Sequence, residues 1–184
     1  MANSPMGLNF IEGVLGVCNI EFNGVDLGIT TDQTEITLDQ DMKEIMAQQS
    51  GTKAYDHVRT GIVFNVTCTF GTITTALCAA LNPSFEPSGS GQSMKVGRNL
   101  YQSAKDNEGK KLVLKRVDSE GVSTTDPVYM MTFYNAAPTI TSGFVYGADV
   151  QRAISVTFNV YWDVTNQAYA YMGNASSVGL IPAV

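Results

Sequence analysis

The clearest pattern in this 184-residue chain is an alternation of apolar and polar side chains. Residues 62–70 place an apolar side chain at every second position, and residues 154–164 repeat the scheme. The positions in between are mostly asparagine, serine, threonine and other polar residues. Successive side chains of a β-strand point to opposite faces, so a period of two predicts a strand with one face on a core. We therefore expect two long strands of the same design.

Further strands are expected where β-branched and aromatic residues cluster between Gly, Asn, Asp and Pro. The dipeptide Asn23-Gly24 predicts a hairpin turn between two of them. A helical apolar stripe is strong only in residues 72–81, which Asn82-Pro83 ends. The predicted class is mainly β with one flanking α-helix, and the additional strands cover residues 15–22, 26–31, 33–42, 111–117 and 128–136.

Long segments without a hydrophobic period surround these elements. Residues 46–60 form a polar excursion between two expected strands, and residues 82–126 begin with a run rich in Pro, Gly and Ser. Residues 165–184 contain mainly small side chains. Such segments in a compact domain are usually disordered or used to bind partners. We interpret the chain, residues 1–184, as a single domain with long inter-strand loops and extended termini, including an N-terminal arm at 1–13.

Composition narrows the function classes. A hydrophobic fraction of 44% is enough to fill a core, and the net charge of -6 has the wrong sign for gripping nucleic-acid phosphates. No secretory leader and no membrane-spanning apolar run is recognisable, so we expect folding in a cytosol. The three cysteines have no metal-binding spacing, and we expect Cys18, Cys68 and Cys78 to be buried and reduced.

Patterns that carry chemistry are weak. The only histidine, His57, has no nucleophile or metal motif to serve, so a solvated or interface position is favoured. The glycines before Lys95 have the wrong spacing for a phosphate loop. The acidic region 26–44 lacks the calcium-loop pattern and reads as a solvated acidic face. We therefore expect no enzyme activity, no cofactor and no metal.

The order of segments resembles the phage major tail tube proteins. Residues 16–30, with sequence GVCNIEFNGVDLGIT, are similar to the opening hairpin of that family. Residues 34–70 are similar to its second hairpin, which consists of a strand, a long protruding loop and a returning strand. Residues 137–164 are similar to its closing hairpin. The resemblance covers residues 14–70 and 127–164, and it leaves most of 82–126 without a counterpart.

This resemblance implies a β-sandwich or barrel that assembles into hexameric rings, which stack into the hollow tube of a phage tail. The implied location is the virion tail, after assembly in the cytoplasm of the host bacterium. The implied partners are further copies, a tape-measure protein, terminator and tip or baseplate proteins, a sheath if the tail is contractile, and DNA as passing cargo. Loops and arms would bridge the rings, and for the loop at 46–60 we select Gln48, Tyr55, Asp56, His57 and Arg59.

The polar strand faces carry acidic or neutral side chains and no lysine or arginine, which suits a channel that repels DNA. An ordinary solvated sheet face is the alternative, although such faces usually mix both signs of charge. The expected lumen-facing residues are Glu35, Thr37, Asp39, Asn65, Thr67, Thr69, Ser155, Thr157, Asn159 and Asp163.

A different class of function is also compatible with the sequence, namely a soluble β-sandwich binding or adhesin module on a virion surface. Such a module needs an exposed aromatic platform. The residues that would provide it are Tyr101, Tyr129 and Tyr146.

Overall fold

The fold is described by a computed structural model. It covers residues 18–46, 54–71, 74–82, 84–87, 94–96, 103–117, 120–141 and 153–173. The expected N-terminal arm at 1–13, residue Gln48 and residues 174–184 of the expected C-terminal tail lie outside these ranges.

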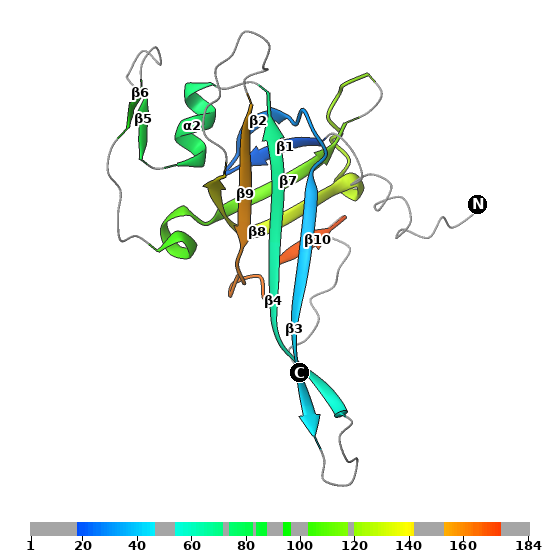
Figure 1. Ribbon diagram of the computed structural model, residues 1–184. Helices are drawn as coiled ribbons and strands as arrows, with labels where there is room; N and C mark the ends of the chain where they lie inside the picture. The colour runs from blue at the N-terminus through cyan, green and yellow to red at the C-terminus, as the bar shows by residue number, and fades with distance from the viewer. Residues whose placement is uncertain are drawn as a thin grey trace, which may run out of the picture.

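Most of the described chain belongs to one antiparallel sheet (Figure 1). A two-stranded sheet, the helix α2 (Thr75–Leu81), a π-helical turn (Ala104–Glu108) and a 3₁₀ turn (Pro127–Tyr129) accompany it. The predicted class, mainly β with one α-helix, is confirmed. The strands of the large sheet run in the order β2 (Val25–Ile29), β1 (Cys18–Phe22), β7 (Lys110–Arg116), β8 (Met130–Ile140), β9 (Ile154–Val160), β4 (Ala54–Phe70) and β3 (Glu35–Met46), with β10 (Ala170–Met172) on β8, and the small sheet pairs β5 (Phe85–Pro87) with β6 (Met94–Val96).

The first two strands are joined by the predicted turn. Asn23 and Gly24 both have positive φ, 52° and 76°, as a two-residue hairpin turn with right-handed strand twist requires. Glycine adopts this backbone without steric cost, and asparagine is among the residues that tolerate it best. The hairpin predicted from Asn23-Gly24 is therefore confirmed.

The large sheet curls until the end of β2 reaches the end of β4, which makes it barrel-like. Thr30, directly after β2, forms a β-bridge to Phe70 at the end of β4. The amide of Thr31 donates to the carbonyl of Thr69 at 2.9 Å. The strands β2 and β4 stand far apart in the order of the sheet, so these contacts close the wall around one interior.

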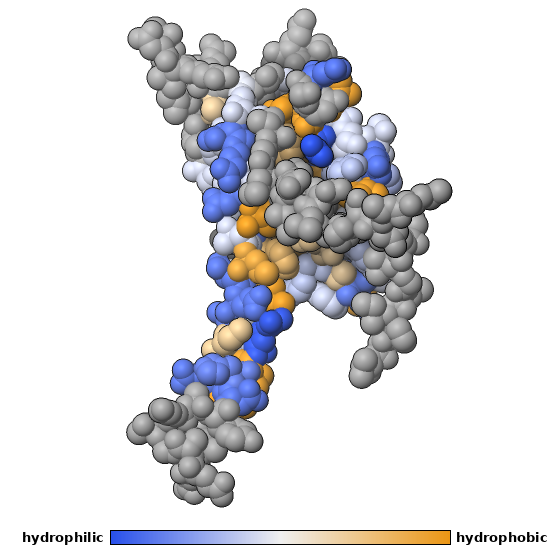
Figure 2. Space-filling model, turned by 90° about the vertical axis from the view of Figure 1, so that its right-hand side faces the viewer, coloured by the Kyte–Doolittle hydropathy of each residue, from blue (hydrophilic) through white to orange (hydrophobic). Residues whose placement is uncertain are grey.

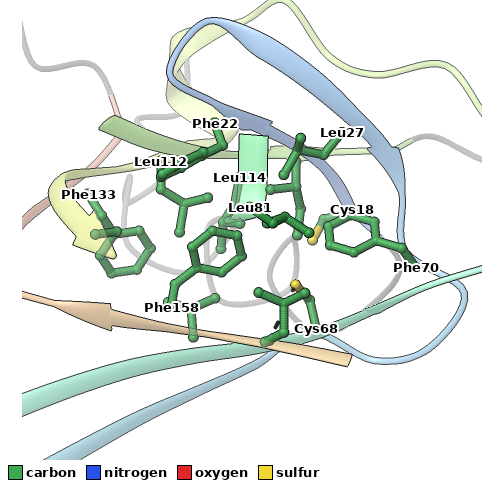
Figure 3. Packing of buried hydrophobic residues seen from close by; sticks show 14 of the residues in the cluster. Cys18, Phe22, Leu27, Cys68, Phe70, Leu81, Leu112, Leu114, Phe133 and Phe158 are labelled. Carbon is green, nitrogen blue, oxygen red and sulfur yellow. Dashed lines mark hydrogen bonds between the residues drawn. The ribbon is translucent and has the colours of Figure 1, made fainter. Parts of the chain in front are cut away.

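The interior is filled from all sides by apolar side chains (Figure 3). Helix α2 covers it with Leu77, Cys78 and Leu81, and the Thr74 side chain caps its start by accepting from the Leu77 amide at 3.1 Å. All three cysteines are buried and free, as predicted. The largest fully buried side chains are Phe70, Phe133, Phe158, Ile20, Leu81, Leu112, Met131, Ile154, Val66 and Val156.

The structure corrects the expected loop at 46–60. Strand β3 continues to Met46 and strand β4 begins at Ala54, so residues 54–60 are strand. The pairs Lys43↔Val58 and Glu44↔His57 hold this polar stretch in register. Hydrophobic alternation marks a strand only where one face is buried, and this ribbon has no core beneath it.

Two other expected segments are also corrected. The strand predicted at 111–117 is confirmed as β7, but it lies between β1 and β8 in the middle of the large sheet, so the region 82–126 is not simply an insertion or long loop region. The expected C-terminal tail at 165–184 contains β10, which pairs with β8 through Ala170↔Phe133. A strand of three residues is too short to produce a recognisable period, so the sequence pattern could not reveal it.

Candidate functional site

One outward face of the sheet is lined by short polar side chains from β3, β4 and β9. Asn65 lies between Thr37 and Asn159, and Thr67 lies between Glu35 and Thr157 in the register of the strands. Thr69 is opposite Ser155. We call these eight residues, with Asp39, the polar face. The polar face thus brings together all the residues predicted to line a channel except Asp163.

Hydrogen bonds between neighbouring strands tie this face together. The hydroxyl oxygens of Thr67 and Thr157 are 3.2 Å apart, and those of Thr69 and Ser155 are 3.1 Å apart. The amide nitrogen of Asn159 donates to the Thr139 hydroxyl at 3.1 Å, which extends the network onto β8. Cross-strand pairs of this kind stabilise a sheet by about 0.2–1 kcal/mol each. The side chains are therefore held in place by one another.

The charge on the described part of this face is negative. Three carboxylates of β3 lie on this side, because strand residues two or four apart share a face: Glu35, Asp39 and Asp41. The first cation on this side is Lys43, beyond the register shift that follows Asp41. A negatively charged face repels nucleic-acid phosphates, and it cannot bind them by displacing their counterions.

Asp163 lies apart from the other predicted channel residues. It follows the end of β9 and forms an isolated bridge with Ala168. Its carboxylate accepts hydrogen bonds from the backbone and side-chain amides of Asn166, at 2.7 and 2.9 Å. This carboxylate therefore stabilises a tight turn between Asp163 and Asn166.

The second notable feature is a hairpin that projects from the body (Figure 1). Strand β4 has 17 residues, but only Phe64 to Phe70 pair with β9. Residues 54–63 pair with β3 alone. We call residues 38–46 and 54–63 the projecting hairpin. An isolated two-stranded ribbon is marginally stable in water, so a projecting hairpin of this length is expected to rest on a partner.

Apolar side chains are exposed on both faces of the projecting hairpin, and Figure 2 shows apolar groups on the side that faces the viewer. Leu38 and Met42 lie on the face that continues the core side, where they are 46% and 58% exposed. Val63, Val58 and Ile45 lie on the opposite face and are also exposed. Exposed apolar groups that continue along one element indicate a binding surface.

The charged residues predicted for contacts between rings lie on this hairpin. Asp56, His57 and Arg59 are exposed on β4. Nε2 of His57 is 3.8 Å from Oε1 of Glu44 across the strand pair. Tyr55 is also part of β4.

A hollow of about 280 Å³ lies where β9 separates from β4. The rings of Phe64 and Tyr169 are 5.7 Å apart, and those of Tyr169 and Trp162 are 5.1 Å apart. We call these three residues the aromatic shelf. Trp162 is 43% exposed, although the alternation in residues 154–164 places it on the core side. This shelf could not be predicted from the sequence, because the strand ends at Val160 while the alternation of apolar residues continues to Val164.

Of the three residues predicted for the aromatic platform of a binding module, the structure describes only Tyr129. Tyr101 and Tyr146 lie outside the described ranges. Tyr129 is half-buried, and the guanidinium carbon of Arg116 lies 5.5 Å from the centre of its ring. This cation–π contact occupies one face of the Tyr129 ring.

Other kinds of site find little support in the described part of the chain. No group of three or more His, Cys, Asp or Glu side chains there is arranged to hold a metal ion. Lys95, which follows the glycines whose spacing is wrong for a phosphate loop, belongs to β6, and its Nζ lies 3.3 Å from Oε2 of Glu86. None of the described helices is long and apolar enough to span a membrane.

Comparisons with known proteins give little further information. No family model matches the sequence, and no curated protein matches it. Among solved structures, a crystal structure of Hcp protein aligns with 78% of this chain and 87% of its own length. The TM-score is 0.31 and the sequence identity is 12%, so the likeness is distant.

Proposed function

We propose that this chain is the structural subunit of a hollow tail tube, with no catalytic role. Copies of the chain form hexameric rings, and the rings stack into a tube through which phage DNA passes. The sequence resemblance of residues 14–70 and 127–164 to phage major tail tube proteins supports this proposal. In this proposal the protein is located in the virion tail, after assembly in the host cytoplasm.

The observation that carries the proposal is the projecting hairpin. It continues the sheet beyond the core, exposes apolar groups on both faces, and leaves strand edges without neighbours in the described structure. Exposed edges of this kind pair readily with other chains, and a monomer usually blunts or covers them. Self-assembly satisfies both the backbone groups and the apolar side chains.

The polar face supplies the lining of the channel in this proposal. Its side chains are short, hydrogen-bonded to one another, and negative or neutral in charge. DNA that passes such a wall meets like charge and no cationic anchor. The remaining partners are a tape-measure protein inside the tube, terminator and tip or baseplate proteins at its ends, and a sheath if the tail contracts.

Electron microscopy and sedimentation of the purified chain test the proposal. We expect hexameric rings or tubes whose abundance increases with protein concentration. A monomer that stays dispersed at high concentration would contradict the proposal. A matched sample of Val58→Lys, which places a charge on the projecting hairpin, should contain fewer stacked rings than the wild type.

A further inference from the structure

Strand β9 leaves β4 at a defined point. After Val160 the chain follows β8, because the amide of Tyr161 donates to the carbonyl of Asn135 at 2.8 Å. It then returns as β10, which also pairs with β8. From Val63 towards Ala54, the edge of β4 that faces away from β3 therefore has no pairing strand in the described structure.

The aromatic shelf forms the floor beside this edge. Phe64 points to the core side of β4, since its ring lies 6.4 Å from the ring of buried Phe133. Tyr169 contacts Phe64 on that same side, and Trp162 packs against Tyr169. The hollow at the shelf is thus open to a strand that continues the line of β9.

The same hairpin carries a second, different edge. The side of β3 that faces away from β4 has no pairing strand along its 12 residues in the described structure. Leu38 is opposite Phe64 in the register and shares its face, and Met42 follows on that face. The chain therefore has one edge with exposed aliphatic side chains and another edge with an exposed aromatic floor.

We propose that β3 of a second copy pairs with the free edge of β4, in line with β9. Leu38 and Met42 of that copy then lie over the aromatic shelf. This inference rests on the proposed self-assembly and assigns its lateral contact to particular residues. Because the two edges differ, each copy contacts one neighbour through the free edge of β4 and the other neighbour through the outer edge of β3. This is the head-to-tail arrangement that can close into a ring.

Strand direction and charge agree with this pairing. In a ring built by rotation about an axis along the strands, the β3 of a neighbour keeps the direction of the chain's own β3, which is antiparallel to β4. Arg59 of β4 lies on the same face as Glu44 of β3. Opposite charges on facing strands stabilise a pair, so Glu44 of one copy suits Arg59 of the next.

Disulfide cross-linking between two variants tests the contact. One full-length chain carries Trp162→Cys, and the other carries Leu38→Cys, Gln40→Cys or Met42→Cys, three positions on one face of β3. The native cysteines are at most 5% exposed and do not compete. We expect oxidation of the mixture to give a covalent dimer with at least one of the three partners, whereas each variant alone gives at least tenfold less.

The control is Val122→Cys mixed with Trp162→Cys, because Val122 and Met42 are both 58% exposed. Electron microscopy of the same unoxidised mixtures separates the two proposals. Rings without a cross-link to positions 38, 40 or 42, or with equal cross-linking to position 122, would overturn this contact and leave the tube proposal standing. A dispersed monomer with no cross-link would overturn both.

Discussion

The ring of Phe22 in β1 lies 5.4 Å from the ring of Phe158 in β9, although β7 and β8 separate these strands in the sheet. The contact therefore spans the interior of the barrel. Replacing Phe158 by alanine leaves a cavity that both walls border, and we expect the free energy of unfolding to fall by about 3–5 kcal/mol. Urea denaturation measures this change.

The neighbouring residue Thr157 provides the control on the opposite face of the same strand. Thr157→Val keeps the shape and removes only a hydroxyl that contacts Thr67. We expect a loss of about 1 kcal/mol. Equal losses for the Phe158 and Thr157 variants would contradict the assignment of the two faces.

Alkaline pH should destabilise the fold through its buried thiols. Burial raises the pKa of the Cys68 thiol far above its usual value of 9.0, and the neighbouring Cys18 raises it further. The folded state then keeps a proton that the unfolded state loses, so this contribution to stability is complete below about pH 9 and declines above it. The free energy of unfolding should fall between about pH 9 and pH 10.5.

Cys68→Ala removes this titration. We expect the variant to be less stable than the wild type at neutral pH, but to lose less stability on raising the pH. Urea denaturation at a series of pH values measures both slopes. Identical slopes would show that the alkaline loss arises from other groups, such as Tyr134, whose pKa burial also raises.

A cation on the polar face should make assembled tubes retain DNA. Asp39→Lys places a lysine on this exposed face, while Asp106→Lys makes the same change in charge on the π-helical turn. We expect both variants to assemble, and only the Asp39 variant to bind DNA more tightly than the wild type. Binding should weaken between about 50 and about 200 mM salt. Equal DNA binding by the two variants would contradict the proposal that the polar face lines the channel.

The projecting hairpin should matter for assembly more than for the stability of the monomer. Val58→Lys and Val122→Lys each replace an exposed valine by lysine, the first within the projecting hairpin and the second outside it. Surface substitutions usually change stability by no more than about 0.5 kcal/mol, so thermal unfolding should barely distinguish them. Sedimentation velocity should show less assembly for the Val58 variant alone. Equal assembly would place the contacts between rings elsewhere.

Local elements were predictable wherever the sequence alternates above a core. The strands around Val66 and Val156 and the turn at Asn23-Gly24 follow from period and turn chemistry. The strand at 33–42 was predicted, but its continuation to Met46 and the strand at 54–60 were not, because the charged and apolar residues there obey no period and their order comes from backbone pairing. The aromatic shelf did not follow either. Its formation depends on where β9 parts from β4, which is a property of the sheet and not of either strand alone.

Strand β4 has a further mechanical consequence. One uninterrupted strand of 17 residues runs from the tip region of the hairpin to the closure of the barrel at Phe70. At about 3.3 Å per residue it is roughly 55 Å long. A force that pulls on the hairpin is transmitted along the backbone of β4 into the core. There it acts parallel to β4 and β9, so that the hydrogen bonds between these two strands share the load. Strand β4 thus resists tension along its length, and in the proposed tail tube it connects the hairpin mechanically to the core of the subunit.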